Sequence, residues 1–359
     1  MAPAIGPITA RKLIGKAGSA GSVFSMSKEA LESIEGIGPR VWGAIRTPGL
    51  KDQAKREVEF LDRHRIHAHY FEDPGYPARL NQWTDGPVIL YSRGTLNLNT
   101  EKSLSVVGTR RASSYGRDLC REIIKGLSEH LPGLVIVSGL AYGIDVMAHR
   151  AALEYGLPTV AVLAHGLSTL YPASHRDTAE RIISQGALVT DFDSGMGPER
   201  NNFLRRNRII AGFSQATLVV ESPEKGGALI TASMASSYNR DILAVPGRAG
   251  DPRSRGCNNL IKRSMAALTE SHEDILRHLN WETSTDSEKK ALQPLDLSSD
   301  EKKILLHVEN TPGITPDSLS NLTGFPVSMV LAMLLEMELK QWVSVEPGNR
   351  YRCRISALP

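Results

Sequence analysis

Short apolar runs alternate with amphipathic stretches through the middle of the chain, from about residue 66 to residue 281. The runs are rich in Val, Ile and Leu, and they follow one another at intervals of roughly 25 to 30 residues. They cover residues 103–109, 134–139, 159–164, 187–192, 216–222 and 241–247. Helical periodicity lies between them, around residues 116–130, 145–155, 175–185, 203–213 and 228–239. Continuous apolar runs are typical of parallel strands that helices cover on both faces, so the pattern predicts an α/β fold with a doubly wound parallel sheet.

The sheet topology also indicates which edge of the sheet binds a ligand. In an extended Rossmann-like sheet, the loops that follow the strands gather along one edge, and ligands bind in the crevice there. We therefore expect the functional residues of the 66–281 domain in the loops after its strands.

The segment 1–65 shows no strand pattern and is predicted to form short helices joined by glycine turns. The turn Gly36-Ile37-Gly38-Pro39 is typical of a helix-hairpin-helix, in which amide N–H groups at a helix N-terminus can bind a phosphate. A small helical bundle of SAM type, with this turn serving only to connect two helices, explains the pattern equally well. A second such turn, Ile5-Gly6-Pro7, lies so close to Met1 that we expect this end to be shortened.

Beyond residue 281 the composition changes twice. Residues 282–299 are polar and are predicted to form a linker. The segment 300–359 then has helical patterns at 300–310, 315–322 and 326–338, followed by a hairpin whose turn is Pro347-Gly348-Asn349. Three helices and a hairpin predict a winged-helix domain. Its recognition helix has few polar side chains for phosphates or base edges, so we expect protein contact rather than DNA reading.

Composition and charge exclude little. The chain has 359 residues, is 41% hydrophobic and 23% charged, and carries a formal charge of +3, so the positions of the charges matter more than their sum. Its three cysteines lie far apart without metal-ligand spacing, which fits the cytosol and predicts neither disulfides nor a zinc site. No apolar run approaches the roughly 20 residues that cross a membrane. We expect no cofactor and no metal.

The first candidate site is the turn 108–111 (GTRR), which follows the strand 103–109. Backbone N–H groups and a helix N-terminus can face an anion at such a turn, and Arg110 can bind a phosphate through its planar guanidinium. The turn lacks the GxGxxG pattern, and Ser138-Gly139 stands where a ribose-binding acid would follow the next strand, which disfavours a dinucleotide. A tight turn with solvated arginines is the alternative.

The second candidate is the densest basic cluster of the chain, residues 200–208 (RNNFLRRNR), with four arginines, three asparagines and one aromatic residue. Arginines bind phosphates, asparagines offer donors and acceptors, and Phe203 can stack on a base, a contact worth about 1–3 kcal/mol. Alternatively, Phe203 packs in the core and some arginines only solvate the surface. The candidate DNA-binding residues here are Arg200, Asn202, Phe203, Arg206, Asn207 and Arg208.

Three further loops complete the predicted edge. Gly139 and Tyr142 follow the second strand, where small residues let a ligand approach. Asp145 is expected to cap the next helix, and His149 is expected to pack or to lie on the helix surface. Lys225 and Gly226 follow the fifth strand, and Arg248 follows the sixth, near Arg253, Arg255, Asn258, Asn259 and Lys262. No catalytic motif or acid–base carboxylate pair accompanies these loops, although Glu221 leaves an enzymatic role open.

Five segments together resemble the DNA-processing protein A (DprA/Smf) family: SVVGTRRASSYG, VSGLAYGIDVMAHRAAL, VAVLAHGL with LYPASH, NNFLRRNRIIAGFSQATLVVESPEKGGALITASMA, and ILAVPGR with GCNNLI. The resemblance implies a cytosolic bacterial protein of natural transformation. It also implies binding of incoming single-stranded DNA, a homodimer formed through the Rossmann-like domain, and help in loading the RecA recombinase, without catalysis.

Residue by residue, the resemblance implies a phosphate pocket of Gly108, Thr109 and Arg110, with a strand path along Arg200, Phe203, Arg206, Asn207 and Lys225. Tyr142 departs from relatives that carry a basic residue in this turn, and Lys225 or Arg248 are possible substitutes. The rival is a nucleotide phosphoribohydrolase of the lysine-decarboxylase-like Rossmann group. Its PGGxGTxxE motif is not matched by ESPEKGGALITA, which occupies the comparable place.

Overall fold

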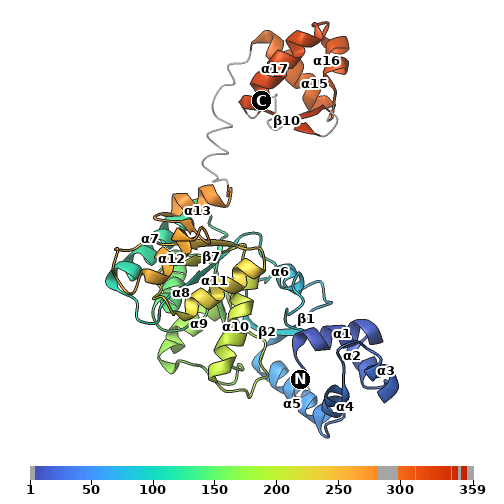
Figure 1. The fold of residues 1–359 in the computed structure, drawn as a ribbon, viewed down its shortest axis with the longest axis vertical. Coiled ribbons are helices and arrows are strands. Elements are labelled where there is room, and N and C mark those ends of the chain that lie inside the picture. The colour runs from blue at the N-terminus through green and yellow to red at the C-terminus, as the bar shows by residue number, and fades with distance from the viewer. Residues whose placement is uncertain (1–4, 282–297, 312, 341, 347–348, 354–359) are drawn as a thin grey trace. The chain divides into compact units, whose positions relative to one another are not determined.

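The computed structural model describes residues 5–281, 298–311, 313–340, 342–346 and 349–353. Contacts divide the chain into two compact units, Met1–Asp286 and Ser287–Pro359 (Figure 1). The first unit contains both the predicted helical segment and the predicted α/β segment. Most of the predicted linker, residues 282–297, lies outside the described residues.

A nine-stranded sheet forms the centre of the first unit, in the order β1-β2-β6-β5-β4-β3-β7-β8-β9. The six predicted strands are all present and run parallel: β3 (Ser103–Val107), β4 (Val135–Ser138), β5 (Thr159–Val162), β6 (Ala187–Thr190), β7 (Ala216–Val219) and β8 (Asp241–Ala244). The prediction of a doubly wound parallel sheet is therefore confirmed. The structure adds the short parallel strand β9 (Ala267–Leu268) and two antiparallel strands, β1 (His67–Tyr70) and β2 (Ile89–Gly94), none of which was predicted.

Helices cover both faces of the sheet because the strands are apolar on both sides. Ile136 of β4 packs in one core with α7 (Ser114–His130), α8 (Ile144–Glu154) and α13 (His272–His278). Its neighbours Val135 and Val137 pack in the opposite core. That second core includes α10 (Arg200–Phe213), α11 (Gly227–Ser237), α12 (Arg255–Lys262) and α6 (Ala78–Asn81). Helix α9 (Arg176–Gln185) packs beside α8.

The order of the strands reverses between the neighbours β3 and β7. From β3 the chain adds β4, β5 and β6 on one side, and from β7 it adds β8 and β9 on the other. The loops that follow these strands meet, since the backbone N–H of Thr109 donates to the carbonyl of Glu221 at 2.7 Å. Such a switch point is where doubly wound sheets bind their ligands. The fold therefore brings the 108–111 turn to this point.

The helical segment before the sheet has five helices: α1 (Pro7–Ala17), α2 (Ala20–Val23), α3 (Lys28–Glu32), α4 (Pro39–Ile45) and α5 (Leu50–His64). It is anchored to the sheet at both ends. The Arg11 guanidinium donates to the carbonyl of Gly86 at 3.0 Å, and the Glu57 carboxylate accepts from the backbone and hydroxyl of Ser194 at 2.8 and 2.7 Å.

The second unit has the predicted winged-helix order. Helices α15 (Ser299–Asn310), α16 (Pro316–Thr323) and α17 (Val327–Leu339) precede the hairpin of β10 (Val343–Glu346) and β11 (Arg350–Cys353). The unit has its own core, and Pro347 and Gly348 of the predicted turn lie outside the described residues. Within the part of the chain that the structure describes, no single helix is long and apolar enough to cross a membrane. Helices α16 and α17 reach that length only as a pair bent by 114°.

Candidate nucleic-acid interface

A narrow cleft opens at the edge of the sheet where the strands end. It is lined by Arg110 from the loop after β3, by Gly139, Ala141 and Tyr142 after β4, by Ala164, Tyr171 and Pro172 after β5, and by Phe203 of α10. Four of the predicted site residues, Arg110, Gly139, Tyr142 and Phe203, thus meet in one place.

An arginine and two aromatic rings form one wall of this cleft. The Arg110 guanidinium lies over the Phe203 ring, 5.0 Å from its centre, and the Tyr171 ring meets Phe203 edge-on at 6.0 Å. Arg110 is exposed, while Phe203 is half-buried and therefore keeps part of its surface accessible. A cation beside aromatic faces matches a ligand that carries both phosphates and bases.

Tyr142 also lines the cleft and is 47% exposed. Its hydroxyl is 3.2 Å from the hydroxyl of Ser174, and its ring meets His175 edge-on at 4.9 Å. His175 in turn donates from Nδ1 to the carbonyl of Leu140 at 2.9 Å. The turn that carries Tyr142 is therefore fixed against the segment that opens α9.

Tyr171 and Pro172 were missing from the predicted site. His165 fixes this loop: its Nδ1–H donates to the carbonyl of Gly166 at 2.9 Å, and its Nε2 accepts from the backbone N–H of Tyr171 at 3.1 Å. The Tyr171–Pro172 bond is cis. The available signal was the LYPASH segment, an aromatic residue in a loop that follows a predicted strand.

The amide cradle predicted for the 108–111 turn differs from what the structure shows. The N–H of Thr109 is bound to Glu221, and a Cβ at Gly108 would lie 2.4 Å from Ile144. Glu221 is buried, and its carboxylate accepts from the N–H of Ser113 at the start of α7 at 2.8 Å. The helix N-terminus that was expected to bind a phosphate is thus occupied by a carboxylate of the protein itself. Arg110 is the group of this turn that reaches the cleft.

Arg206 was predicted to line the strand's path, but its side chain is buried beneath the cleft. Its guanidinium donates to the carbonyls of Gly139, at 2.7 Å, and Val162, at the ends of β4 and β5. Burial lowers the pKa of Arg206 to about 10, although the nearby Asp145 carboxylate acts in the opposite direction. A Cβ at Gly139 would lie 2.1 Å from the guanidinium, so a larger residue there would displace the Arg206 side chain. Arg206 and Gly139 therefore support the cleft floor, and the Arg206 guanidinium does not face a ligand.

Asn202 and Arg208 also differ from their predicted roles. Asn202 is buried and donates to the carbonyl of Gly197 at 3.1 Å. Arg208 forms an ion pair with the buried Asp191 carboxylate. Asn207 accepts from Arg206 Nε at 3.2 Å. Of the predicted residues in this cluster, Arg200 is exposed and Phe203 reaches the cleft.

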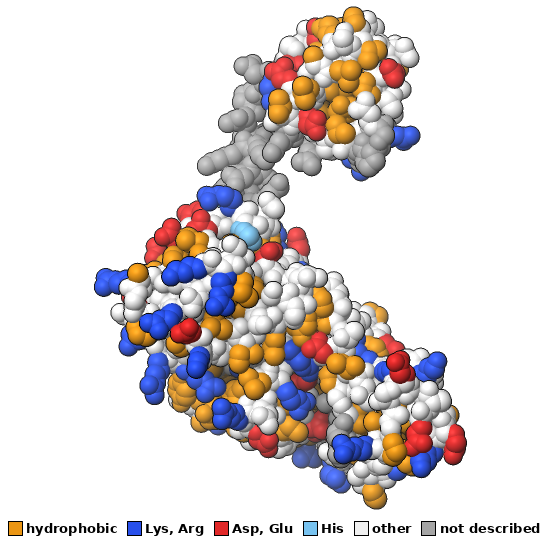
Figure 2. Space-filling model, viewed as in Figure 1, with side chains coloured by type: hydrophobic (Ala, Val, Ile, Leu, Met, Phe, Trp, Pro, Cys, Tyr) orange, Lys and Arg blue, Asp and Glu red, His pale blue; other side chains and the backbone are white. Residues whose placement is uncertain are grey.

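Lys225, Gly226 and Arg248 lie on the other side of the switch point, in the loops after β7 and β8, and they do not line the cleft. Lys225 and Arg248 are exposed. Near Arg248, a second shallow cleft is lined by Gly247, Ala249, Gly250, Asp251, Arg255, Asn258, Asn259, Ile261 and Lys262. Figure 2 shows Lys and Arg side chains over the part of the first unit that holds α12. Direct contact of these residues with DNA stays a prediction.

Two titratable residues under the cleft face away from solvent. His149 is fully buried, its Nδ1 donates to the hydroxyl of Thr159 at 2.7 Å, and burial lowers its pKa to about 3. Its predicted packing role is confirmed. Asp145 lies inside the first turn of α8 and not at its N-cap, which is Gly143, and burial raises its pKa. Among the described residues, no group of three His, Cys, Asp or Glu side chains could hold a metal ion.

The fold and the cleft define a Rossmann-like α/β protein with a ligand site on its strand-end loops, joined to a winged-helix unit. The chain belongs to the DNA recombination-mediator protein A family, the DprA/Smf family of DNA-processing proteins. The model of that family matches residues 67–280, and the model of the DprA winged-helix domain matches residues 288–349.

Similar proteins agree with this assignment. The chain is 33% identical to protein Smf of Synechocystis, with 98% of this chain and 96% of that protein covered, and 37% identical to protein Smf of Escherichia coli, with 78% and 75% covered. The crystal structure of DNA processing protein A from Streptococcus pneumoniae matches with a TM-score of 0.65 at 30% identity, over 76% of this chain and 98% of that one. The Helicobacter pylori protein matches with a TM-score of 0.54 at 24% identity, over 60% and 96%, and shows the shared fold.

Proposed function

We propose that the first unit binds single-stranded DNA in the cleft of Arg110, Tyr142, Tyr171 and Phe203, and that it catalyses no reaction. The observation that carries the proposal is the exposed Arg110 guanidinium held over the Phe203 ring. Phosphates bind the cation, and unpaired bases stack on the aromatic faces. Bases that are paired inside a duplex cannot reach rings in a narrow cleft, so single strands are preferred. The Helicobacter pylori relative is described as binding single-stranded DNA, which supports the assignment.

The wider role follows the family. We propose that the chain acts in natural transformation in the cytoplasm, protects incoming single-stranded DNA, and helps to load RecA onto it as a homodimer formed through its Rossmann-like domain. The description of the matching family as recombination mediators supports this role. Cys120 and Cys257 are buried free thiols, which fits the reducing compartment.

The phosphoribohydrolase alternative is disfavoured by the position of Glu221. A general acid or base must reach the reacting atoms. This carboxylate is instead buried and bound to the backbone of Ser113. Incubation with nucleoside monophosphates tests the alternative, because release of free base that requires Glu221 would overturn the proposal.

The binding test is a fluorescence-anisotropy titration of oligo(dT) against a matched duplex at two salt concentrations. We expect tighter binding of the single strand, an affinity that falls steeply with salt, and a loss of about tenfold or more in Arg110→Ala. The matched control is Arg93→Ala, which removes an exposed arginine from β2 without touching the cleft. Equal affinity for single strand and duplex, or no binding, would contradict the proposal.

For the second unit we propose contact with protein rather than with DNA. Along α17, Val327, Leu331, Leu335 and Leu339 recur every four residues and are 38 to 78% exposed, which places an apolar stripe on the predicted recognition helix. Figure 2 shows apolar side chains on the surface of this unit. Such a stripe offers no groups for phosphates. Leu335→Lys should therefore leave oligo(dT) affinity unchanged, and a loss of that affinity would contradict the proposal.

A further inference from the structure

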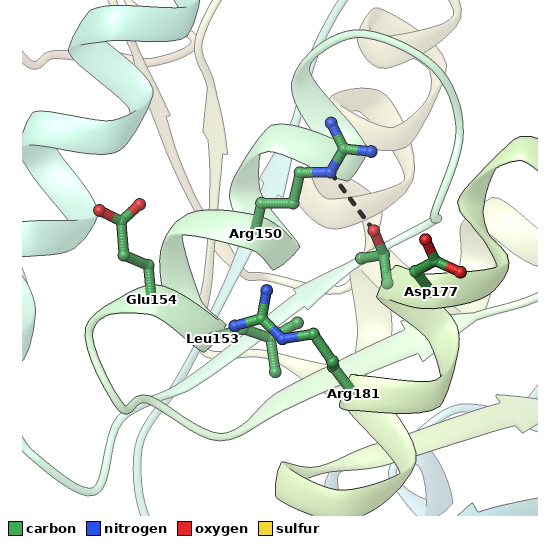
Figure 3. A pocket seen from close by; sticks show the side chains of 6 residues that line it. Arg150, Leu153, Glu154, Asp177 and Arg181 are labelled. Atoms are coloured by element: carbon green, nitrogen blue, oxygen red, sulfur yellow. Dashed lines mark hydrogen bonds between the residues drawn. The ribbon is translucent and has the colours of Figure 1, made fainter.

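Besides the cleft and the shallow cleft near Arg248, the first unit has a groove between α8 and α9. It is lined by Arg150, Leu153 and Glu154 of α8 and by Asp177, Thr178 and Arg181 of α9 (Figure 3). The two helices are tied across it by Arg150, whose Nε donates to the Thr178 hydroxyl at 3.3 Å. The groove is open to solvent and was not part of the predicted site.

Two arginines that line this groove, Arg150 and Arg181, are available to bind an anion. Within the described part of the chain, no carboxylate forms an ion pair with Arg150 or Arg181. In Figure 3 both guanidinium groups extend into the space between the helices, whereas Glu154 points away from it. Glu154 is neutralised by Arg121. Asp177 is the other carboxylate that lines the groove, and it lies in the first turn of α9, where the helix dipole stabilises its negative charge.

The groove lies between the two helices whose starts border the cleft. Tyr142 lies two residues before α8, and Ser174 lies two residues before α9, so their hydroxyl contact at 3.2 Å bridges the starts of the two helices that form the groove. Arg150 stands six residues beyond Ile144, the first residue of α8, about 9 Å along the helix. At the 3.4 Å spacing of stacked nucleotides, that distance is on the order of three nucleotides.

We infer that single-stranded DNA leaves the cleft over Tyr142 and enters the α8–α9 groove, where Arg150 and Arg181 bind its phosphates. The inference rests on the proposed function of the cleft. It also accounts for Tyr142, which cannot neutralise a phosphate itself: the positive charge is supplied further along α8 and α9.

The test compares two oligonucleotide lengths on the full chain. Arg150→Ala/Arg181→Ala should leave the affinity for the short oligonucleotide oligo(dT)6 unchanged. The affinity for oligo(dT)20 should fall about tenfold, and the slope of log K against log salt should become shallower by about 1.4, at roughly 0.7 per phosphate contact. The matched control is Arg93→Ala/Arg277→Ala, which also removes two exposed arginines but from β2 and α13.

The outcomes separate this inference from the proposed function. A double variant that matches the control on oligo(dT)20, or that loses affinity equally for both lengths, would overturn the exit path. Arg110→Ala decides independently whether the cleft binds DNA, because this residue lies in the cleft and not in the groove. Unchanged affinity for oligo(dT)6 also shows that the double variant is folded.

Discussion

Arg206→Ala gives the sharpest test of the division between residues that contact DNA and residues that hold the cleft. The substitution would strip the buried carbonyls of Gly139 and Val162 of their donor, and leave the Asp145 carboxylate without its positive neighbour. Each unsatisfied buried group costs about 1–3 kcal/mol, and removing one partner of a buried charge pair costs about 3–5 kcal/mol. Because these terms overlap, we expect the free energy of unfolding to fall by about 3–5 kcal/mol.

Thermal unfolding followed by circular dichroism measures this loss. For a domain of this size, 1 kcal/mol corresponds to about 2–4 °C, so the Tm of the first unit should fall by roughly 6–20 °C. The loss should depend on pH. Burial raises the pKa of Asp145, and without Arg206 it would rise further, so the protonated carboxyl is favoured in the folded state. The destabilisation is therefore fully present at pH 8 and becomes smaller as the pH falls toward the carboxyl's ordinary value of 3.8.

Arg110→Ala is the comparison variant, because Arg110 is exposed and its removal leaves no buried partner unsatisfied. It should lose DNA affinity and keep its Tm. If Arg206→Ala instead kept the Tm of the unaltered chain and lost only DNA affinity, Arg206 would be a ligand contact and the reasoning above would be refuted.

Three further predictions concern the cleft and its support. Phe203→Ala should weaken oligo(dT) binding by about 1–3 kcal/mol in anisotropy titrations; an unchanged affinity would exclude stacking on this ring. The buried His149 must stay neutral, since its pKa is about 3 in the folded chain and 6.5 otherwise. Stability should therefore fall as the pH drops below about 6.5, and the slope of Tm against pH between 7 and 5 should be smaller in His149→Asn. Glu221→Gln should lower stability by about 0.3–2 kcal/mol in urea unfolding, because the charge at the start of α7 is lost, without weakening oligo(dT) binding; weaker binding would place Glu221 in the site.

The sequence was sufficient to predict the sheet because its six central strands are apolar on both faces. The antiparallel strand β1 was missed for the opposite reason. In β1, His67, Ala68, His69 and Tyr70 are at least partly exposed, so the segment lacks an apolar run. Its position is set by pairing with β2, for example of His69 with Leu90. The residues of β1 alone do not predict this pairing.

The arginine-rich cluster shows how far composition can mislead within one helix. Asn202, Arg206, Ile209 and Phe213 are spaced by four, three and four residues, and all four are buried on one face of α10. Because Arg206 stands at this helical spacing from the apolar residues Ile209 and Phe213, the pattern identifies it as a core residue. A count of positive charges does not reveal this. Glu221 offers no such signal, because its partner Ser113 lies 108 residues away in the chain.

The same carboxylate disfavours a dinucleotide at this edge of the sheet. Doubly wound proteins that bind dinucleotides place the pyrophosphate at the N-terminus of the helix after the first strand of the switch point. Here Glu221 occupies that position, and a Cβ at Gly116 would lie 2.6 Å from its Oε2, so the helix is packed closely against it. A phosphate at that point would meet a buried negative charge. The cation that the loop after β3 presents to the cleft is Arg110, which lies over the Phe203 ring, so a ligand phosphate is expected at the cleft and not at the start of α7.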